Sequence, residues 1–338
     1  MSSLPRMMDA SSGDLLYPRA EVLAGPPIAL GCMHMGGAWD ANASIPEEAK
    51  EKARAAVETA LELGWNFFDH ADIYCHGKSE KVFAEVVKEL GVAREDIILQ
   101  SKCGIRFPGD PSPECPHRFD FSADHIEASV EESLRRLETD YLDLLLLHRP
   151  DLLAEPEEVL AAFDSLRNEG KVRHFGVSNF PPHVLDLFRE AGFIPVANQV
   201  ELNILRTSLF DDDVVASRRL PAPGHPADGT LAWHRRHGVV TQAWAPLAYG
   251  YPSGRRPDWD HERVHATANV VRDIARIHDV QEEAVVIAFL LRHPAGIQPI
   301  IGSRNPERLR ACDAARRIRL SREEWYRLYL AGRGEPLP

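Results

Sequence analysis

Between residues 28 and 317 the chain alternates short apolar runs with longer segments of helical periodicity, and this alternation constrains the fold most strongly. Such alternation is typical of parallel βαβ units, in which a helix follows each strand and returns the chain. Eight units follow one another without an intervening hairpin pattern. We therefore predict a single-domain α/β fold, a closed (β/α)8 TIM barrel with long βα loops and a C-terminal helix.

The predicted strands are short, largely apolar, and end in polar residues. They span residues 28–33, 66–71, 97–102, 142–148, 174–179, 197–203, 239–246 and 297–303. The fourth of these, LDLLLLH, is apolar on both faces, as expected of a parallel strand covered by helices. No G-x-G-x-x-G turn follows the first strand, which argues against an open dinucleotide-binding sheet.

Start and stop signals delimit several of the predicted helices. Ser44 and Glu47 have capping-box spacing, Pro46 suits the first helical turn, and Gly64 ends the segment. In the helix predicted after the third strand, four apolar residues fall on one face: Ile126, Val130, Leu134 and Leu137. A long helical stretch is predicted from about 261 to 292.

We assign residues 1–27 to a partly flexible N-terminal segment and residues 28–338 to the barrel. Residues 321–330 predict an amphipathic terminal helix that docks on the barrel. Two loops are long, 103–121 and 204–227. Long loops in a compact domain commonly act as lids or binding loops, or are disordered.

Charge and cysteine content narrow the classes of function. The chain has 51 acidic and 39 basic residues and a net charge of −12, which argues against general nucleic-acid binding. Five scattered cysteines, without a C-x-x-C pair, suggest neither a disulfide framework nor a zinc site. The sequence shows no signal-peptide core and no membrane-spanning apolar run. We expect a cytoplasmic monomer or small homo-oligomer with no nucleic-acid or membrane partner.

Polar residues gather where the predicted strands end. They are Asp69, His70, Lys102, His148, Ser178, Asn179, Gln199, Trp244, Ser303 and Arg304. Enzymes with this fold place their chemistry at this rim. Because at least five strands deliver polar groups to one face, isolated structural ion pairs explain the set poorly.

Four residues suggest a specific chemical task, the protonation of an oxygen. Tyr74 titrates near pH 10 when unperturbed, and the ammonium of Lys102 is expected to lower its pKa. Asp69 is the natural counter-ion for a buried lysine, and His148 can orient a substrate oxygen. Such a set suits a carbonyl oxygen that gains negative charge as the carbon accepts hydride.

Four segments resemble the aldo-keto reductase family: FFDHADIY (67–74), ILQSKCG (98–104), YLDLLLLHRPD (141–151) and IIGSRNPERL (300–309). Further matches are GKVRHFGVSN, NQVELN and QAWAPLAYG, so the resemblance covers Ile28 to about Arg317. The sequence is most similar to bacterial-type members of the family, several of which are known only as generic oxidoreductases. The resemblance implies an NAD(P)H-dependent enzyme that reduces an aldehyde or ketone, with NADP preferred over NAD.

The resemblance also implies roles, residue by residue. Tyr74 corresponds to the general acid, Lys102 and Asp69 tune it, and His148 positions the carbonyl. The implied cofactor residues are Ser178, Asn179 and Gln199 at the nicotinamide carboxamide, Trp244 stacked on its ring, Ala245, Pro246, Leu247 and Gly250 at the pyrophosphate, and Gly302, Ser303, Arg304 and Arg308 at the adenosine end. No metal is implied.

The sequence departs from the family pattern at three positions. Ala311 and Cys312 stand where an acid and an amide often hold the adenine. Cys75 replaces a glycine that commonly follows the catalytic tyrosine.

Two other functions compete with reduction of a carbonyl. His70, Asp72 and His76 can be grouped as the metal site of a barrel hydrolase, but that leaves Lys102 unexplained. We interpret His70 as a packing residue and Asp72 as a loop acid. The second alternative is a regulatory or sensor subunit that binds NADP(H) with little turnover, and the intact set of four catalytic residues argues against it.

Overall fold

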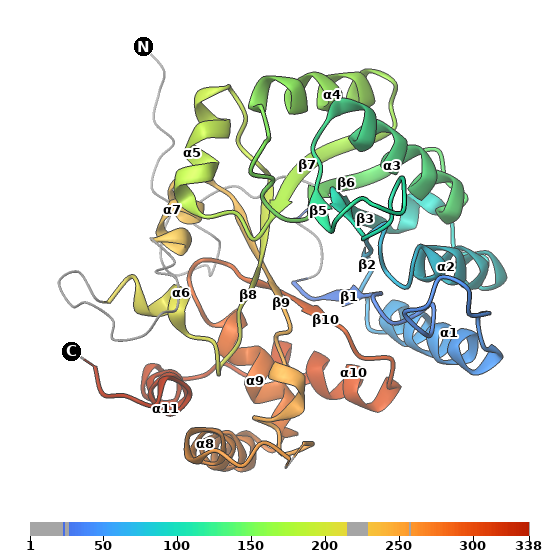
Figure 1. Ribbon diagram of the computed structural model, residues 1–338. Coiled ribbons are helices and arrows are strands. Elements are labelled where there is room, and N and C mark those ends of the chain that lie inside the picture. The colour runs from blue at the N-terminus through green and yellow to red at the C-terminus, as the bar shows by residue number, and fades with distance from the viewer. Residues whose placement is uncertain (1–22, 24–26, 215–228, 257, 338) are drawn as a thin grey trace.

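The computed structural model describes residues 23, 27–214, 229–256 and 258–337, which form a closed barrel of parallel strands (Figure 1). The strands are β1 (Ala29–Gly31), β2 (Phe67–Asp69), β3 (Ile98–Cys103), β6 (Leu142–Leu147), β7 (Val172–Ser178), β8 (Ala197–Glu201), β9 (Val240–Trp244) and β10 (Gln298–Ile301). Pairing of β10 with β1 closes the barrel. The predicted fold class is confirmed. Nearly all of the N-terminal segment and most of the 204–227 loop lie outside the described residues.

Helices cover the outside of the barrel (Figure 1). They are α1 (Glu47–Glu62), α2 (Lys78–Glu89), α3 (Ala123–Leu137), α4 (Pro156–Asn168), α5 (Pro182–Glu190), α6 (Ser208–Asp211), α7 (Thr230–His237), α8 (Glu262–His278), α9 (Glu282–Leu291), α10 (Pro306–Asp313) and α11 (Arg322–Arg333). Three 3-10 turns are η2 (Arg94–Asp96), η3 (Ala248–Gly250) and η4 (Ala314–Arg317). The stretch predicted at 261–292 is two helices, because Asp279 adopts a left-handed φ of 52° that ends α8.

Two sets of apolar side chains stabilise the barrel. The larger fills the space between strands and helices, and it includes the predicted apolar face of α3. The smaller consists of Leu23, Ala29, Phe67, Leu144, Leu146, Ala197, Val240 and Ile300. Along β6, Leu144 and Leu146 belong to the smaller cluster while Leu145 and Leu147 belong to the larger, so this strand is apolar on both faces as predicted.

The predicted capping box of the first helix is wrong. Pro46 is the residue before α1, with φ −67° and ψ 144°, and no side chain caps the helix. Because this extended residue separates Ser44 from the helix, its hydroxyl cannot reach the free amides of the first turn. Gly64 adopts φ 75° just beyond the C-terminal end, as its predicted stop signal requires.

The long loop at 103–121 contains structure of its own. The short strands β4 (Ile105–Arg106) and β5 (Arg118–Phe119) pair antiparallel within it. Arg106 donates to Asp110 and Asp120, which ties the two sides of the loop together. This loop is therefore an ordered wall beside the barrel mouth.

The terminal helix α11 docks on the barrel, as predicted. Ser321 and Glu324 form a capping box at its start, and Trp325 donates from Nε1 to the carbonyl of Phe289 over 2.9 Å. At its other end Gly332 packs so closely that an added Cβ would lie 1.9 Å from the backbone oxygen of Ile204. Only glycine permits this approach.

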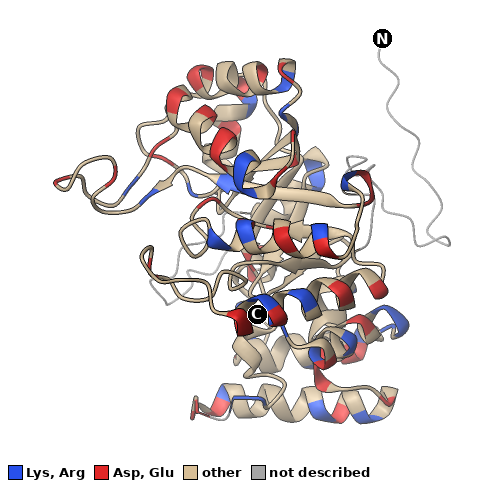
Figure 2. Cartoon of the chain, turned by 90° about the vertical axis from the view of Figure 1, so that its right-hand side faces the viewer, with Lys and Arg blue, Asp and Glu red and all other residues tan. Residues whose placement is uncertain are grey.

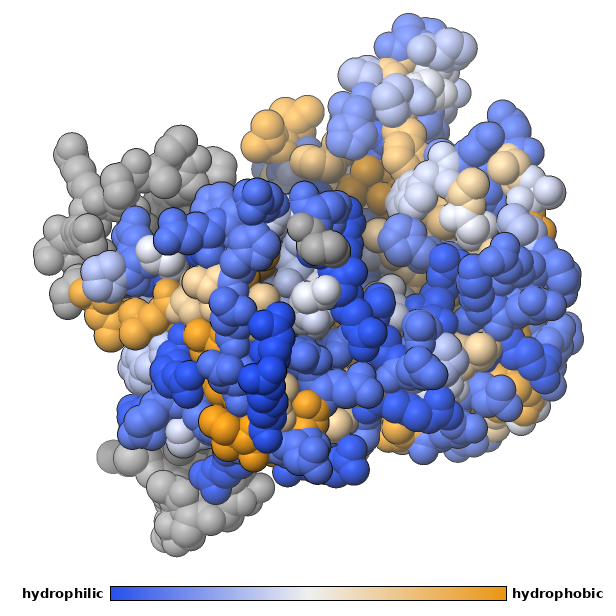
Figure 3. Space-filling model, turned by 90° about the horizontal axis from the view of Figure 1, so that it is seen from below, coloured by the Kyte–Doolittle hydropathy of each residue, from blue (hydrophilic) through white to orange (hydrophobic). Residues whose placement is uncertain are grey.

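Charged residues of both signs are interspersed on the outer helices, while the strands carry few of them (Figure 2). Seen from below, the molecule is mainly hydrophilic, with hydrophobic residues in scattered groups (Figure 3). None of the helices in the described part of the chain is both long and apolar enough to cross a membrane.

Gly332→Ala is expected to destabilise the protein by about 1–3 kcal/mol, because the methyl group forces α11 away from Ile204. Urea unfolding measures the change. Arg327→Ala serves as the control, since Arg327 is exposed on the same helix and lies 4.0 Å from Asp273. Equal stability of the two variants would contradict the close docking of α11.

Candidate active site

The polar rim forms because parallel strands end on the same side of the barrel. Asp69 is the last residue of β2, Lys102 lies near the end of β3, and His148 directly follows β6. Tyr74 follows β2 by five residues, in the turn that leads to α2. The structure thus brings the four predicted catalytic residues together from three neighbouring strands and their loops.

The ammonium of Lys102 lies at the centre of this group. Its Nζ donates to Asp69 Oδ1 at 2.6 Å, to Tyr74 Oη at 2.9 Å and to the backbone oxygen of His70 at 2.7 Å. The lysine side chain is fully buried and that of Asp69 is 3% exposed. All three donors of the ammonium are therefore used, which is what a buried charge requires.

Asp69 is also held by side-chain amides inside the barrel. Its Oδ1 accepts from Nε2 of Gln100 and, at 3.0 Å, from Nε2 of Gln199. Gln199 donates in addition to Gln242 at 3.1 Å, and Gln242 donates to Gln298 at 2.9 Å. This chain of amides crosses the barrel interior and fixes the carboxylate that pairs with the lysine.

Tyr74 is a neutral acid in this environment. Burial raises its pKa to about 12, although Lys102 acts in the opposite direction. Lys102 lowers this pKa as expected, but desolvation of the phenolate outweighs the nearby ammonium, so the pKa stays above its ordinary value. Burial lowers the pKa of Lys102, but Asp69 and Tyr74 raise it above its ordinary value, so the lysine stays charged.

Burial also keeps His148 neutral, although it shifts the pKa in the opposite direction. Burial lowers its pKa well below the ordinary value, and the charges of Lys102 and Arg149 lower it further. Its ring lies edge-on to Tyr74, with 6.0 Å between the ring centroids. Nδ1 is buried and has no hydrogen-bond partner among the residues described. A neutral imidazole beside the phenol can donate a hydrogen bond to a substrate oxygen.

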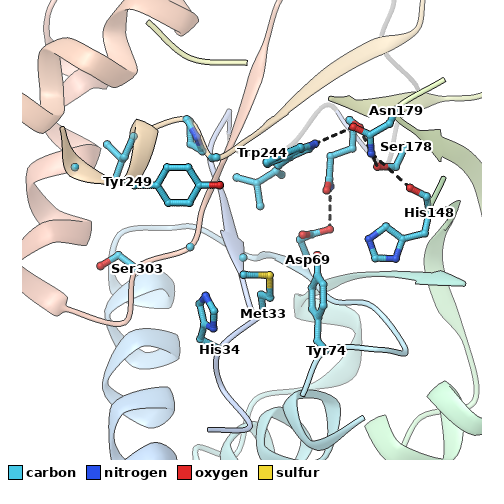
Figure 4. Close-up of a pocket in the computed structure, with 18 of the residues that line it drawn as sticks. Met33, His34, Asp69, Tyr74, His148, Ser178, Asn179, Trp244, Tyr249 and Ser303 are labelled. Carbon is cyan, nitrogen blue, oxygen red and sulfur yellow. Dashed lines mark hydrogen bonds between the residues drawn. The ribbon is translucent and has the colours of Figure 1, made fainter. Parts of the chain in front are cut away.

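These residues open onto a cavity of about 510 Å³ at the rim of the barrel (Figure 4). Most of the predicted site residues line it: Asp69, Tyr74, His148, Ser178, Asn179, Gln199, Trp244, Ala245, Pro246, Leu247, Gly250, Gly302, Ser303 and Arg308. Lys102 is buried behind Asp69 and Tyr74 and does not line the cavity. Arg304 does not line it either, although its charge adds to the effect of burial in lowering the pKa of His34, which does line the cavity.

A hydrogen-bonded network joins three of the predicted cofactor residues (Figure 4). Trp244 donates from Nε1 to Asn179 Oδ1 at 3.1 Å, and Asn179 donates from Nδ2 to Ser178 Oγ at 2.7 Å. Asn179 and Ala245 both have positive φ, 62° and 50°. Left-handed backbone at non-glycine residues stores strain and is found most often at functional sites.

The cavity wall near Tyr74 is largely apolar. Met33, Trp39, Ile73 and Ile105 line it, and the ring of Trp39 lies 6.4 Å from that of Tyr74. Met33 and Trp39, which follow the first strand, therefore contribute to the lining of the cavity.

The lining residues that were not predicted include Arg149, Tyr249 and Glu283. Arg149 and Tyr249 adjoin predicted residues in sequence and could have been found. Glu283 lies in the first turn of α9, where an acid is commonplace, so the sequence gives no signal for it.

The segment after Asp69 does not form a metal site. Within the described residues, no group of three or more His, Cys, Asp or Glu side chains can hold a metal ion. His70 is fully buried and packs edge-on against Phe83, with 4.6 Å between centroids, which agrees with its predicted packing role. Burial raises the pKa of Asp72 to about 8, with Glu80 adding to the effect.

Cys75 has a backbone conformation that favours glycine. Its φ of 49° is left-handed, and its thiol lies 3.3 Å from the backbone oxygens of Met33 and Gly37. The thiol therefore links the turn after Tyr74 to the loop after β1.

Comparison with known proteins decides the family. A model of the Aldo/keto reductase family matches residues 27–329. The chain belongs to this family. It is an oxidoreductase, and the resemblance noted in its sequence motifs is confirmed.

Individual relatives cover most of this aldo-keto reductase. An uncharacterized oxidoreductase, YcsN of Bacillus subtilis (strain 168), is 37% identical over 289 residues, which are 83% of this chain and 88% of that protein. A 6-dehydroglucose reductase of Agrobacterium fabrum is 36% identical over 285 residues, with the same two coverages of 83% and 88%. The structure of an aldo-keto reductase from Klebsiella pneumoniae in complex with NADP and acetate superposes with a TM-score of 0.67 at 25% identity, covering 90% of each chain.

Lys102→Met is expected to destabilise the enzyme by about 3–5 kcal/mol, because it leaves Asp69 as an unpaired buried charge. Adding Asp69→Asn removes that charge and should restore at least about half of the loss. Denaturant unfolding of both single variants and the double variant measures the coupling. A double variant less stable than Lys102→Met alone would contradict the buried ion pair.

Proposed function

We propose that this enzyme reduces an aldehyde or a ketone to the alcohol with NADPH as hydride donor and Tyr74 as general acid. One observation carries the proposal: the hydrogen-bonded chain from Tyr74 through Lys102 to Asp69 ends at a cavity beside His148. Proton donation to a developing oxyanion requires a neutral acid and a fixed nearby positive charge, and this arrangement offers both.

The cavity suits a dinucleotide in its chemistry. Trp244 offers an aromatic face, and the amide and hydroxyl groups of Asn179, Ser178 and Gln199 can bond a carboxamide. Gly302 and Ser303 lie at the opposite end with Arg308, whose guanidinium can pair with a 2′-phosphate. The NADP complex of the Klebsiella relative supports this choice of cofactor. When bound, NADPH supplies a hydride from C4 of its nicotinamide.

The side chains of the enzyme direct the proton. His148 and the hydroxyl of Tyr74 hold the substrate carbonyl oxygen by hydrogen bonds. As that oxygen gains charge, Tyr74 donates its proton, and Lys102 stabilises the phenolate that remains. Asp69 keeps Lys102 charged and in place. The apolar wall formed by Met33 and Trp39 excludes water from the reacting atoms.

Tyr74→Phe is expected to lower kcat by about 10²–10⁴-fold, because the variant has no proton to donate. NADPH affinity should remain within about twofold, since the hydroxyl points toward the substrate. NADPH oxidation is measured with a panel of aldehydes and ketones that includes 6-dehydroglucose, the sugar named for the Agrobacterium relative. Unchanged turnover in the variant rules out Tyr74 as the acid, and a wild type inactive on the whole panel favours the regulatory-subunit alternative.

The rate of carbonyl reduction should be independent of pH from about 6 to 9. Tyr74, with its pKa raised to about 12, is protonated throughout this range, and His148, with its pKa well below 6.5, is neutral throughout. The active acid is lost only as pH rises toward the tyrosine pKa. Measurement of kcat/KM at saturating NADPH tests this expectation. A tenfold fall per pH unit with a midpoint near 7 would show that another group supplies the proton.

A further inference from the structure

One carboxylate in the cavity takes no part in the proposed proton transfer. Glu283 lies in α9, is 1% exposed, and lines the cavity. Its Oε1 accepts from Nε of Arg255 at 2.8 Å and lies 4.0 Å from Nε of Arg308. Its Oε2 is buried and has no hydrogen-bond partner in the part of the chain that the structure describes. A buried carboxylate oxygen that faces a cavity without a protein partner is free to accept a hydrogen bond from a ligand.

Glu283 lines the cavity beside Arg308. Arg308, near its carboxylate, is in α10 just after Ser303, and Figure 4 shows Ser303 and Tyr249 on the opposite side of the cavity from Tyr74 and His148. Glu283 is also close enough to affect Cys312 in α10: burial raises the pKa of that thiol, and the charge of Glu283 raises it further. The carboxylate therefore lies beside the residues expected at the adenosine end.

We infer that Oε2 of Glu283 accepts a hydrogen bond from the exocyclic amine of the adenine of the cofactor, an inference that rests on the proposed use of NADPH. At the adenosine end, hydrogen-bond donors are limited to that amine and the ribose hydroxyls. In NADPH the 2′ oxygen carries a phosphate, which a carboxylate repels and which Arg308 attracts. The amine is therefore the donor that a carboxylate can accept without conflict.

The proposed contact compensates for a loss in α10. Ala311 has no polar side-chain atom, and Cys312 is fully buried with a weakly polar thiol, so neither residue can accept strongly from an adenine. Glu283 approaches the same region from the neighbouring helix α9. Arg255 anchors the opposite oxygen and so fixes the orientation in which Oε2 faces the cavity.

The contact predicts discrimination between purines. In the hypoxanthine analogue of NADPH, a carbonyl oxygen replaces the amine, so two acceptors face each other. A site built to accept a hydrogen bond from a ligand amine rejects the analogue that lacks it. The wild type should therefore bind NADPH at least about tenfold more tightly than the hypoxanthine analogue.

Titrations followed by protein fluorescence, without any substrate, measure both affinities. In Glu283→Gln the affinity for NADPH over that for the hypoxanthine analogue should fall to about threefold or less, because a carboxamide can accept from the amine or donate to the carbonyl. Glu283→Asp keeps the charge but withdraws the oxygen, and its ratio should fall as well. Arg256→Met is the matched control: Arg256 pairs with Asp258 rather than with Glu283 and does not line the cavity, so both affinities and their ratio should persist.

Several outcomes overturn the inference. If the wild type binds NADPH and its hypoxanthine analogue equally well, the amine contact does not exist, but the proposed function stands. A wild-type ratio that persists in both Glu283 variants assigns the discrimination to another residue. If the Glu283 variants change the preference for NADPH over NADH but keep the ratio of affinities for NADPH and its hypoxanthine analogue, Glu283 contacts the ribose instead. Absence of binding to any of these dinucleotides overturns the proposed function together with the inference.

Discussion

The buried ion pair between Lys102 and Asp69 is the interaction on which the site depends. A charge without water needs every donor and acceptor matched. The barrel meets this requirement by placing the pair on adjacent strands, β2 and β3, and by surrounding Asp69 with amides from β3 and β8. Tyr74 uses the remaining side-chain contact of the ammonium. The position of the acid at the cavity is thus set by a network that lies beneath it.

Burial acts on Tyr74 and His148 in opposite directions and keeps both neutral. It raises the pKa of the phenol and lowers that of the imidazole. The lysine then has a different role from the one that its proximity first suggests. In the proposed mechanism, Lys102 does not make the tyrosine acidic in the resting protein but offers a fixed positive charge to the phenolate that forms as Tyr74 donates its proton. In this proposal Tyr74 stays protonated until the carbonyl oxygen becomes basic. The proton is therefore transferred only as hydride reaches the carbonyl carbon.

The sequence allowed prediction of those parts of the structure that depend on local pattern. Alternating apolar runs fixed the strands, and the polar residue ending each run gave Asp69, Lys102 and His148. Errors arose where distant contacts or a single backbone angle decide the outcome. The extended backbone at Pro46 removes the cap expected from Ser44, and the left-handed Asp279 splits one predicted helix into two. Glu283 could not be predicted because the neighbours that define it, Arg255 and Arg308, are distant in sequence.

The adenosine end illustrates how a motif can change while its chemistry is kept. The motif in α10 has lost its acid and amide to Ala311 and Cys312, which on sequence alone weakens the case for tight adenine binding. In the folded chain, α9 packs against α10, so a carboxylate from the first turn of α9 can reach the same region of the cavity. Arg255 lies in the loop after β9 and pairs with this carboxylate. Glu283 therefore connects that loop to the adenosine end of the cavity. In the inferred contact, Glu283 binds the base with one oxygen and, with the other, holds Arg255 of the loop after β9.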